Sequence, residues 1–215
     1  MPSNVTEEQA SALFRKSLDV YPYGSSVYGT LTENSDRDYI VTVRDDVDLS
    51  DYENEVAEYI SKENHDYQFV KISKFQKGIK DNHLPYLECM FLDHPFIYPY
   101  FKLDRWKLRE SACHISSNSF VKAKKKMTVE KDYDLYKAKK SLFHSLRVLI
   151  FAIQIAEQGR ITDYKAANYI WEEIKDLDIN DWDYYKQKYK PLQNELHSKL
   201  VELCPKPIED GNTDN

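Results

Sequence analysis

The stretch GSSVYGTLTENSDRD, residues Gly24–Asp38, determines how the rest of this chain is interpreted. It holds two of the five glycines of the chain, and glycine lets a backbone approach a ligand closely. It ends in two carboxylates, Asp36 and Asp38, directly before the apolar run Tyr39–Val43. That run predicts a strand, in which residues two apart point to one face. We therefore expect Asp36 and Asp38 to share one face of a sheet.

Two carboxylates on one face repel each other unless a proton or a cation lies between them. A hard divalent cation with oxygen ligands, Mg²⁺ or Mn²⁺, suits such a pair. The alternative is a solvated hairpin, because residues 34–36, Asn-Ser-Asp, are a good turn sequence by themselves. The two glycines, the hydroxyls of Ser25 and Ser26 and the flanking strands favour a nucleotide and metal site over that hairpin.

Alternating helix and strand patterns surround this stretch as far as about residue 105. We expect a helix after Thr6, strands at Asp19–Tyr23, Tyr39–Arg44 and Asp66–Ile72, a helix opening at Ser50 with Val56, Tyr59 and Ile60 facing inward, a helix from Ser73, and an apolar segment Pro85–Leu92 that carries Glu88. This order is typical of a small unit in which helices cover a mixed sheet.

Past Trp106 no strand pattern recurs. We expect helices at about Ser116–Met127, at Lys137–Gln158 with a stop at Gly159, after a cap at Thr162 or Asp163, and at about Asp181–Leu203, where Pro191 should kink or divide the helix. The sequence therefore predicts an α+β protein: a small mixed-sheet domain over residues 1–105, an all-helical domain over residues 106–205 and a flexible tail over residues 206–215.

Charge and cysteine content exclude several classes of protein. The net charge of −6 excludes a protein that binds polyanions over its whole surface, so any nucleic-acid contact must be local. Lys122–Lys126 and Lys137–Lys140 are the candidates for that contact, although most such clusters are solvated faces. The three cysteines are an odd set without CxxC spacing, which indicates reduced thiols and a cytoplasmic protein. We expect no signal peptide and no membrane-spanning segment.

The pattern GSxxYGTxTxxSDxD of residues 24–38 resembles the signature of the DNA polymerase β superfamily of nucleotidyltransferases. The similarity is greatest to the bacterial and phage branch of predicted nucleotidyltransferases that includes RNA-repair-associated members. Asp66–Phe75, Pro85–Phe91 and Lys139–Ile161 resemble further segments of that branch. The resemblance implies that the mixed-sheet domain is a nucleotidyltransferase palm, and that the helical domain closes over its open side around a nucleotide.

The resemblance also implies a role for individual residues. Gly24 and Ser25 would hold the phosphates of the nucleotide, and Asp36 and Asp38 would bind divalent ions. A third carboxylate would come from the third strand, where Asp66 is our choice; Glu88 is the alternative. The remaining predicted nucleotide-binding residues are Ser26, Tyr28, Gly29 and Thr30 in the signature, with His144 and Arg147 on the long helix. His144 and Arg147 share a helix face, so a polar contact with a neighbouring helix is the other interpretation of this pair.

The predicted reaction is the metal-dependent transfer of a nucleoside monophosphate from a nucleoside triphosphate (NTP) to an acceptor hydroxyl, with RNA or tRNA as the acceptor. Three alternatives stay open at this stage. The acceptor could be a Tyr, Ser or Thr of a protein, as in the AMPylation expected of some toxin–antitoxin systems. The domain could be degenerate and only bind a nucleotide or RNA. The Tyr-rich helical half could be a surface for a protein partner.

Overall fold

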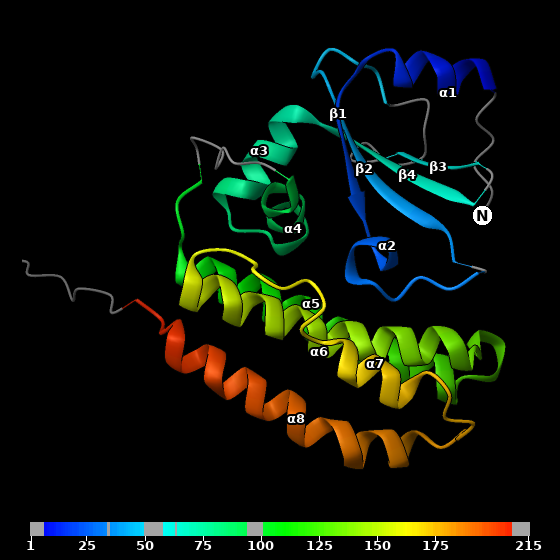
Figure 1. The fold of residues 1–215 in the computed structure, drawn as a ribbon, viewed down its shortest axis with the longest axis vertical. Coiled ribbons are helices and arrows are strands. Elements are labelled where there is room, and N and C mark those ends of the chain that lie inside the picture. Colours follow the sequence, from blue (N-terminus) through cyan, green and yellow to red (C-terminus); the bar gives the residue numbers. More distant parts are fainter. Residues whose placement is uncertain (1–6, 34, 50–57, 63, 94–100, 208–215) are drawn as a thin grey trace, which may run out of the picture. The chain divides into compact units, whose positions relative to one another are not determined.

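A computed structural model describes residues 7–33, 35–49, 58–62, 64–93 and 101–207. The chain forms two compact units, one of residues 1–102 with 163–168 and one of residues 103–162 with 169–215. The helices and strands of the first unit are α1 (Glu7–Phe14), β1 (Ser17–Tyr23), α2 (Ser25–Tyr28), β2 (Arg37–Val43), β3 (Glu58–Lys62), β4 (His65–Lys71), α3 (Ile72–Lys80) and α4 (Leu84–Asp93) (Figure 1). The second part of the chain contributes α5 (Arg105–Thr128), the short 3₁₀ helix η1 (Glu130–Asp132), α6 (Leu135–Gln158), α7 (Asn168–Ile174) and α8 (Trp182–Leu203).

The sheet of the first unit is mixed and has the strand order β1-β2-β4-β3. β1 pairs antiparallel with β2, β2 pairs parallel with β4, and β4 pairs antiparallel with β3. The predicted fold class, a small mixed sheet followed by helices, is therefore confirmed. The strand order also places β2, which follows the signature stretch Gly24–Asp38, in the interior of the sheet with a partner strand on each side.

Helices cover both faces of this sheet, and aromatic side chains hold them there. On one face, the ring of Phe14 in α1 packs edge-on against Tyr67 and Phe69 of β4, with centroids 4.8 and 5.2 Å apart. On the other face, Tyr21 of β1 stacks on Phe75 of α3 at 5.1 Å. The apolar residues of β2 and β4 alternate between these two layers, so the sheet is a rigid base for residues at its ends.

One predicted helix of the first unit is wrong over the residues that the structure describes. Tyr59 and Ile60 were expected on the inner side of a helix opening at Ser50, but they lie in β3. β3 pairs antiparallel with β4, and Asn64, directly before β4, adopts a left-handed conformation (φ 64°), which Asn tolerates better than most residues. An aromatic and a β-branched residue suit a strand well once a partner strand is available. The capping sequence at Ser50 and Val56 lie outside the described residues.

In the second unit, α5, α6 and α8 pack against one another, and α6 is buried over most of its length. The side chain of Asp134 caps α6 by accepting a hydrogen bond from the backbone N–H of Lys137 (2.9 Å). Gly159 ends it in a left-handed conformation (φ 77°), as predicted from the sequence. None of the described helices is apolar over a stretch that could cross a membrane.

Two predicted helix boundaries in this part of the chain need correction. α5 begins at Arg105, earlier than the predicted Ser116, because Asp104 caps it by accepting from the N–H of Lys107. The helix expected directly after Asp163 begins only at Asn168, and Asp163 instead caps a turn by accepting from the N–H of Lys165. Pro191 lies inside α8 and does not divide it. The predicted cap at Thr6 and the tail from residue 208 lie outside the described residues.

Candidate functional site

The signature stretch folds into a single helical turn with a glycine at each end. Gly24 precedes α2 with φ 69°, and Gly29 follows it in a left-handed conformation with φ 71°. Residues with a side chain rarely adopt either conformation, which explains why two of the five glycines lie here. The N–H of Thr30 donates to the carbonyl of Ser25 (3.0 Å) and closes the turn.

Gly24 lies directly against the carboxylate of Asp38. A methyl group on Gly24 would overlap Oδ2 of Asp38 and come within 2.8 Å of its Cγ. The strand register explains this proximity, because Tyr23, the last residue of β1, pairs with Asp38 of β2. The glycine thus brings the peptide backbone at the start of α2 next to a carboxylate.

Asp38 and Asp66 are neighbours across the parallel strands β2 and β4. The register pairs Asp38 with Asp66, and residues paired in this way point to the same face of a sheet. That face is the one opposite α1, because Tyr39 and Tyr67, the next residues on each strand, pack into the core beside α1. Asp66, chosen from the sequence as the third carboxylate, is therefore brought beside Asp38 by strand pairing.

Asp36 lies just outside this arrangement. β2 begins at Arg37, so Asp36 precedes the strand and is exposed. The alternation of side chains along β2 therefore fixes the direction of Asp38 but not that of Asp36. Within the described residues, no three Asp, Glu, His or Cys side chains lie close enough together to hold a metal ion.

The donor set at Asp38 and Asp66 nevertheless fits a hard divalent cation. Carboxylate oxygens are the ligands that Mg²⁺ and Mn²⁺ prefer, and both side chains lie on one face of the sheet. Because Gly24 has no side chain, Oδ2 of Asp38 can lie where a Cβ would otherwise be. Two of the predicted metal ligands are therefore brought together by the fold, and Asp36 lies two residues before one of them.

Glu88, the alternative third carboxylate, lies in α4 and is only 1% exposed. The phenol of Tyr28 donates a hydrogen bond of 2.5 Å to its Oε2. Glu88 thus contacts the signature turn through Tyr28. Burial, with the neighbouring charge of Glu88, raises the pKa of the Cys89 thiol well above its ordinary value.

The other predicted nucleotide-binding residues of the signature differ in exposure. Ser25, Tyr28 and Thr30 are buried, whereas Ser26 is exposed and its hydroxyl donates to the carbonyl of Tyr23 (3.0 Å). Tyr28 and Thr30 therefore stabilise the turn from inside. Within the signature turn, Gly24 is the residue that lies against the Asp38 carboxylate.

His144 and Arg147 lie on α6 of the second unit and contact each other. Nη2 of Arg147 is 2.7 Å from Nδ1 of His144. A guanidinium can only donate, so Nδ1 accepts and the imidazole is neutral with its proton on Nε2. Burial, followed by the positive charges of Arg147 and Lys122, lowers the pKa of His144 well below its ordinary value of 6.5. Both residues share the helix face that their spacing predicted.

Sequence reasoning missed residues 163–168, which fold with the first unit. Nδ2 of Asn168 donates to the carbonyl of Tyr28 (2.9 Å), and the phenol of Tyr164 donates to the carbonyl of Glu88 (2.6 Å). These partners are 140 and 76 residues apart in the chain, so no local pattern could indicate the contacts. The only signal was the pair of polar side chains in a stretch without helical periodicity.

Comparison with known proteins gives one informative match. Residues 6–104 match the family model described as a nucleotidyltransferase domain. No curated protein sequence matches the chain. Among solved structures, the chain is similar to a nucleotidyltransferase-like protein from Exiguobacterium sibiricum, with 13% sequence identity, 92% of this chain and 70% of that chain covered, and a TM-score of 0.29.

Proposed function

We propose, from the premise that residues 6–104 of this chain are a nucleotidyltransferase domain of the DNA polymerase β-like class, that the protein transfers a nucleoside monophosphate from an NTP to a hydroxyl of RNA. The observation that carries this proposal is the parallel register of Asp38 with Asp66 beside Gly24. It supports a nucleotide and metal site formed by the signature together with Asp66 of β4.

The reaction is an in-line displacement at the α-phosphorus. The acceptor oxygen forms a bond to this phosphorus, the bond to the β-phosphate oxygen breaks, and pyrophosphate leaves. The proton of the acceptor hydroxyl passes to a carboxylate of the site. A divalent cation bound there would neutralise charge on the phosphates and favour the deprotonated hydroxyl. We assign Asp36, Asp38 and Asp66 as its ligands, with Glu88 as the alternative to Asp66.

The protein contributes mainly position and charge to such a reaction. We assign the phosphates to the backbone at Gly24 and to the hydroxyls of Ser25 and Ser26. The buried residues Tyr28 and Thr30 and the left-handed Gly29 shape the turn that presents these groups. His144 and Arg147 are further nucleotide-binding candidates on the strength of the sequence resemblance, with Arg147 suited to a phosphate.

The deciding experiment uses NTP labelled at the α-phosphate. The double variant Asp36→Ala with Asp38→Ala should abolish transfer of label to RNA while the fold persists. The matched control is Asp176→Ala with Asp178→Ala, two exposed carboxylates with the same spacing and the same change of charge. Undiminished labelling by the variant of Asp36 and Asp38 would contradict the mechanism. An equal loss of labelling in the control variant would point to a general effect of charge.

The acceptor is tested by what becomes labelled. Incubation with tRNA, with mixed cellular RNA and with cellular protein separates an RNA acceptor from AMPylation of a protein. One observation favours a second candidate, a domain that binds a nucleotide without transferring it: the described acidic residues do not form a three-ligand metal cluster. Thermal stabilisation by Mg²⁺ and NTP without pyrophosphate release is the result expected of that candidate.

A further inference from the structure

Tyr28 forms hydrogen bonds through its phenol and through its backbone carbonyl, both to residues far away in the sequence. Its phenol donates to Oε2 of Glu88 (2.5 Å), and its carbonyl accepts from Nδ2 of Asn168 (2.9 Å). The carbonyl of Glu88 in turn accepts from the phenol of Tyr164 (2.6 Å). Tyr28 and Glu88 are therefore bonded to each other through side chains and to segment 163–168 through their backbones. The four residues form a closed ring of contacts around the end of α2.

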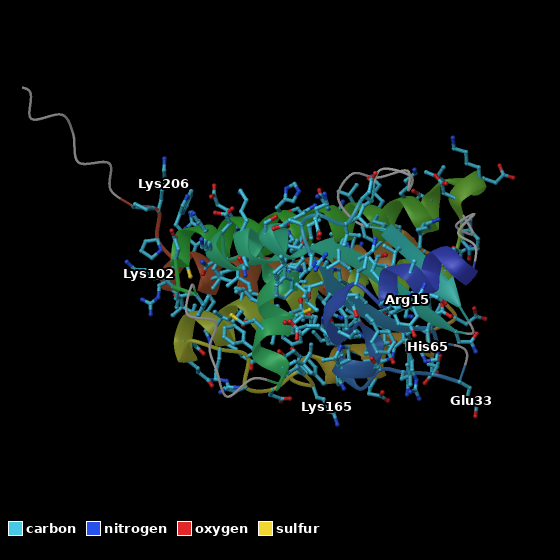
Figure 2. The ribbon with its side chains drawn as sticks, turned by 90° about the horizontal axis from the view of Figure 1, so that it is seen from above. Arg15, Glu33, His65, Lys102, Lys165 and Lys206 are labelled. Atoms are coloured by element: carbon cyan, nitrogen blue, oxygen red, sulfur yellow. The ribbon has the colours of Figure 1, made fainter. Side chains whose placement is uncertain are left out.

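Segment 163–168 also contacts the residue after Tyr28. A methyl group on Gly29 would lie 3.0 Å from Cε of Lys165 and 3.4 Å from Nδ2 of Asn168. The rest of the Lys165 side chain is exposed at the surface (Figure 2). Two consecutive residues of the signature turn, Tyr28 and Gly29, are thus in contact with one short segment that is more than 130 residues further along the chain.

Tyr28 and Glu88 form these contacts in a buried environment. Tyr28 is 2% exposed and Glu88 is 1% exposed, so water competes little for their hydrogen bonds. α2 has only four residues, and a helix this short has no stability of its own. Its position therefore depends on what holds its ends. Beyond residue 102, the six residues of segment 163–168 are the part of the chain that belongs to the first unit.

We propose that Asn168 and Tyr164 are positioning residues for nucleotide binding. They fix the turn Tyr28–Thr30 at the C-terminal end of α2, and through this one-turn helix they fix Gly24 and Ser25 at its other end. The nucleotide site then extends beyond residues 6–104, the part that the family model matches. This inference rests on the proposed function for its kinetic consequence, but the structural coupling does not.

The kinetic test uses two changes that remove the donor without adding a charge and nearly keep the side-chain shape, Asn168→Leu and Tyr164→Phe. Matched controls make the same changes at exposed residues, Asn194→Leu and Tyr169→Phe. We expect the KM for NTP to rise about tenfold in the two test variants, the effect of losing one shielded hydrogen bond, with a much smaller change in kcat. The control variants should keep the wild-type KM.

A second readout is independent of activity. The N–H of Thr30 donates to the carbonyl of Ser25 and so reports whether the turn is closed. Hydrogen exchange at Thr30 should become about tenfold faster in the test variants. Exchange at Val41, in the central strand β2, should stay at the wild-type rate, which separates a loosened turn from a loosened domain.

Each outcome of these two experiments either supports or overturns the positioning role of Asn168 and Tyr164. Wild-type exchange at Thr30 in both test variants overturns the proposal. Faster exchange at Thr30 with an unchanged KM, or equal acceleration at Thr30 and Val41, assigns the segment to general stability and overturns the positioning role. If the wild-type protein transfers no nucleotide at all, the proposed function fails, and exchange at Thr30 still decides whether segment 163–168 holds the signature turn.

Discussion

Gly24 is the residue at which adding a single methyl group should most reduce activity and stability. Its φ of 69° disfavours any side chain, and the methyl group would also overlap the Asp38 carboxylate. We predict that Gly24→Ala lowers the rate of nucleotide transfer at least about 100-fold, because misplacing a reacting group by about 1 Å has an effect of that size. The free energy of unfolding should fall by more than the roughly 1–2 kcal/mol of a left-handed residue, because the ψ of −150° at Gly24 lies in a region that essentially only glycine adopts. Labelled NTP and urea unfolding measure the two effects.

Gly159 provides the matched control for this change. It has a similar φ of 77°, but a methyl group there would meet no atom within 4 Å. Gly159→Ala should therefore lose only the conformational part, about 1–2 kcal/mol, and keep full activity. If both variants lose activity to the same extent, the contact between Gly24 and Asp38 is not what matters.

His144 should make stability depend on pH. Its folded-state pKa lies well below the ordinary value of 6.5, because burial and the charges of Arg147 and Lys122 oppose protonation. As the pH falls below about 6.5, the unfolded chain takes up a proton that the folded protein does not, so the free energy of unfolding falls by at most about 1.4 kcal/mol per pH unit. The stabilisation is fully present above this range.

Urea unfolding of the wild type and of His144→Gln at several pH values from 7.5 to 5.0 measures this contribution. Glutamine keeps an acceptor for Arg147 but cannot titrate. The wild type should lose more stability over this window than the variant. Parallel curves for the two proteins would show that His144 is protonated equally easily in the folded and unfolded states.

The residues of the site could be predicted from the sequence to different extents. Gly24, Asp36 and Asp38 lie within fifteen residues of one another, and their spacing and flanking strands indicated a site without further information. For the third carboxylate, the sequence left a choice between Asp66 and Glu88. The register that pairs Asp66 with Asp38 is what favours Asp66. Asn168 and Tyr164 could not be predicted, because their partners depend on how distant segments pack.

Among the elements, α6 depends most clearly on its cap. Asp134 accepts from the N–H of Lys137 and forms an ion pair with its ammonium (3.3 Å). We predict that Asp134→Ala lowers the free energy of unfolding by about 1 kcal/mol, whereas Asp134→Asn, which can still accept from this N–H, loses much less. Urea unfolding at pH 7 makes the comparison. Equal losses in both variants would assign the effect to the ion pair instead of the cap.

The contrast between α6 and β3 explains which elements a sequence can predict. α6 repeats apolar residues such as Leu142, Leu146 and Leu149 with helical spacing and ends in Gly159, so its own sequence contains the information. β3 carries Tyr59 and Ile60 in a short stretch that suits a helix or a strand equally. Its pairing with β4 decides between them, and pairing is a property of the fold rather than of the stretch.

For the whole molecule, the distribution of charge matters more than its sum. The chain has a net charge of −6, yet residues 121–140 hold eight lysines and three carboxylates. Some of these lysines are already engaged: Lys125 pairs with Asp132 (3.0 Å), and the ammonium of Lys139 donates to the carbonyl of Lys175 (3.0 Å). Lys122 and Lys124 are exposed on α5 and are available to a phosphate backbone. A protein of negative net charge can therefore bind RNA only through a local region such as this one.

This location of charge predicts how RNA binding responds to salt. Each lysine that neutralises a phosphate of single-stranded RNA contributes about −0.7 to the slope of log K against log salt concentration. Lys122→Ala with Lys124→Ala should therefore reduce the magnitude of the slope by about 1.4. The control pair, Lys186→Ala with Lys190→Ala on α8, changes the net charge equally and should leave the slope unchanged. Binding of a labelled RNA oligomer between 50 and 200 mM salt, about the range over which such slopes are resolved, measures both pairs. Equal reductions in the two pairs would mean that net charge, and not the α5 lysines, governs binding.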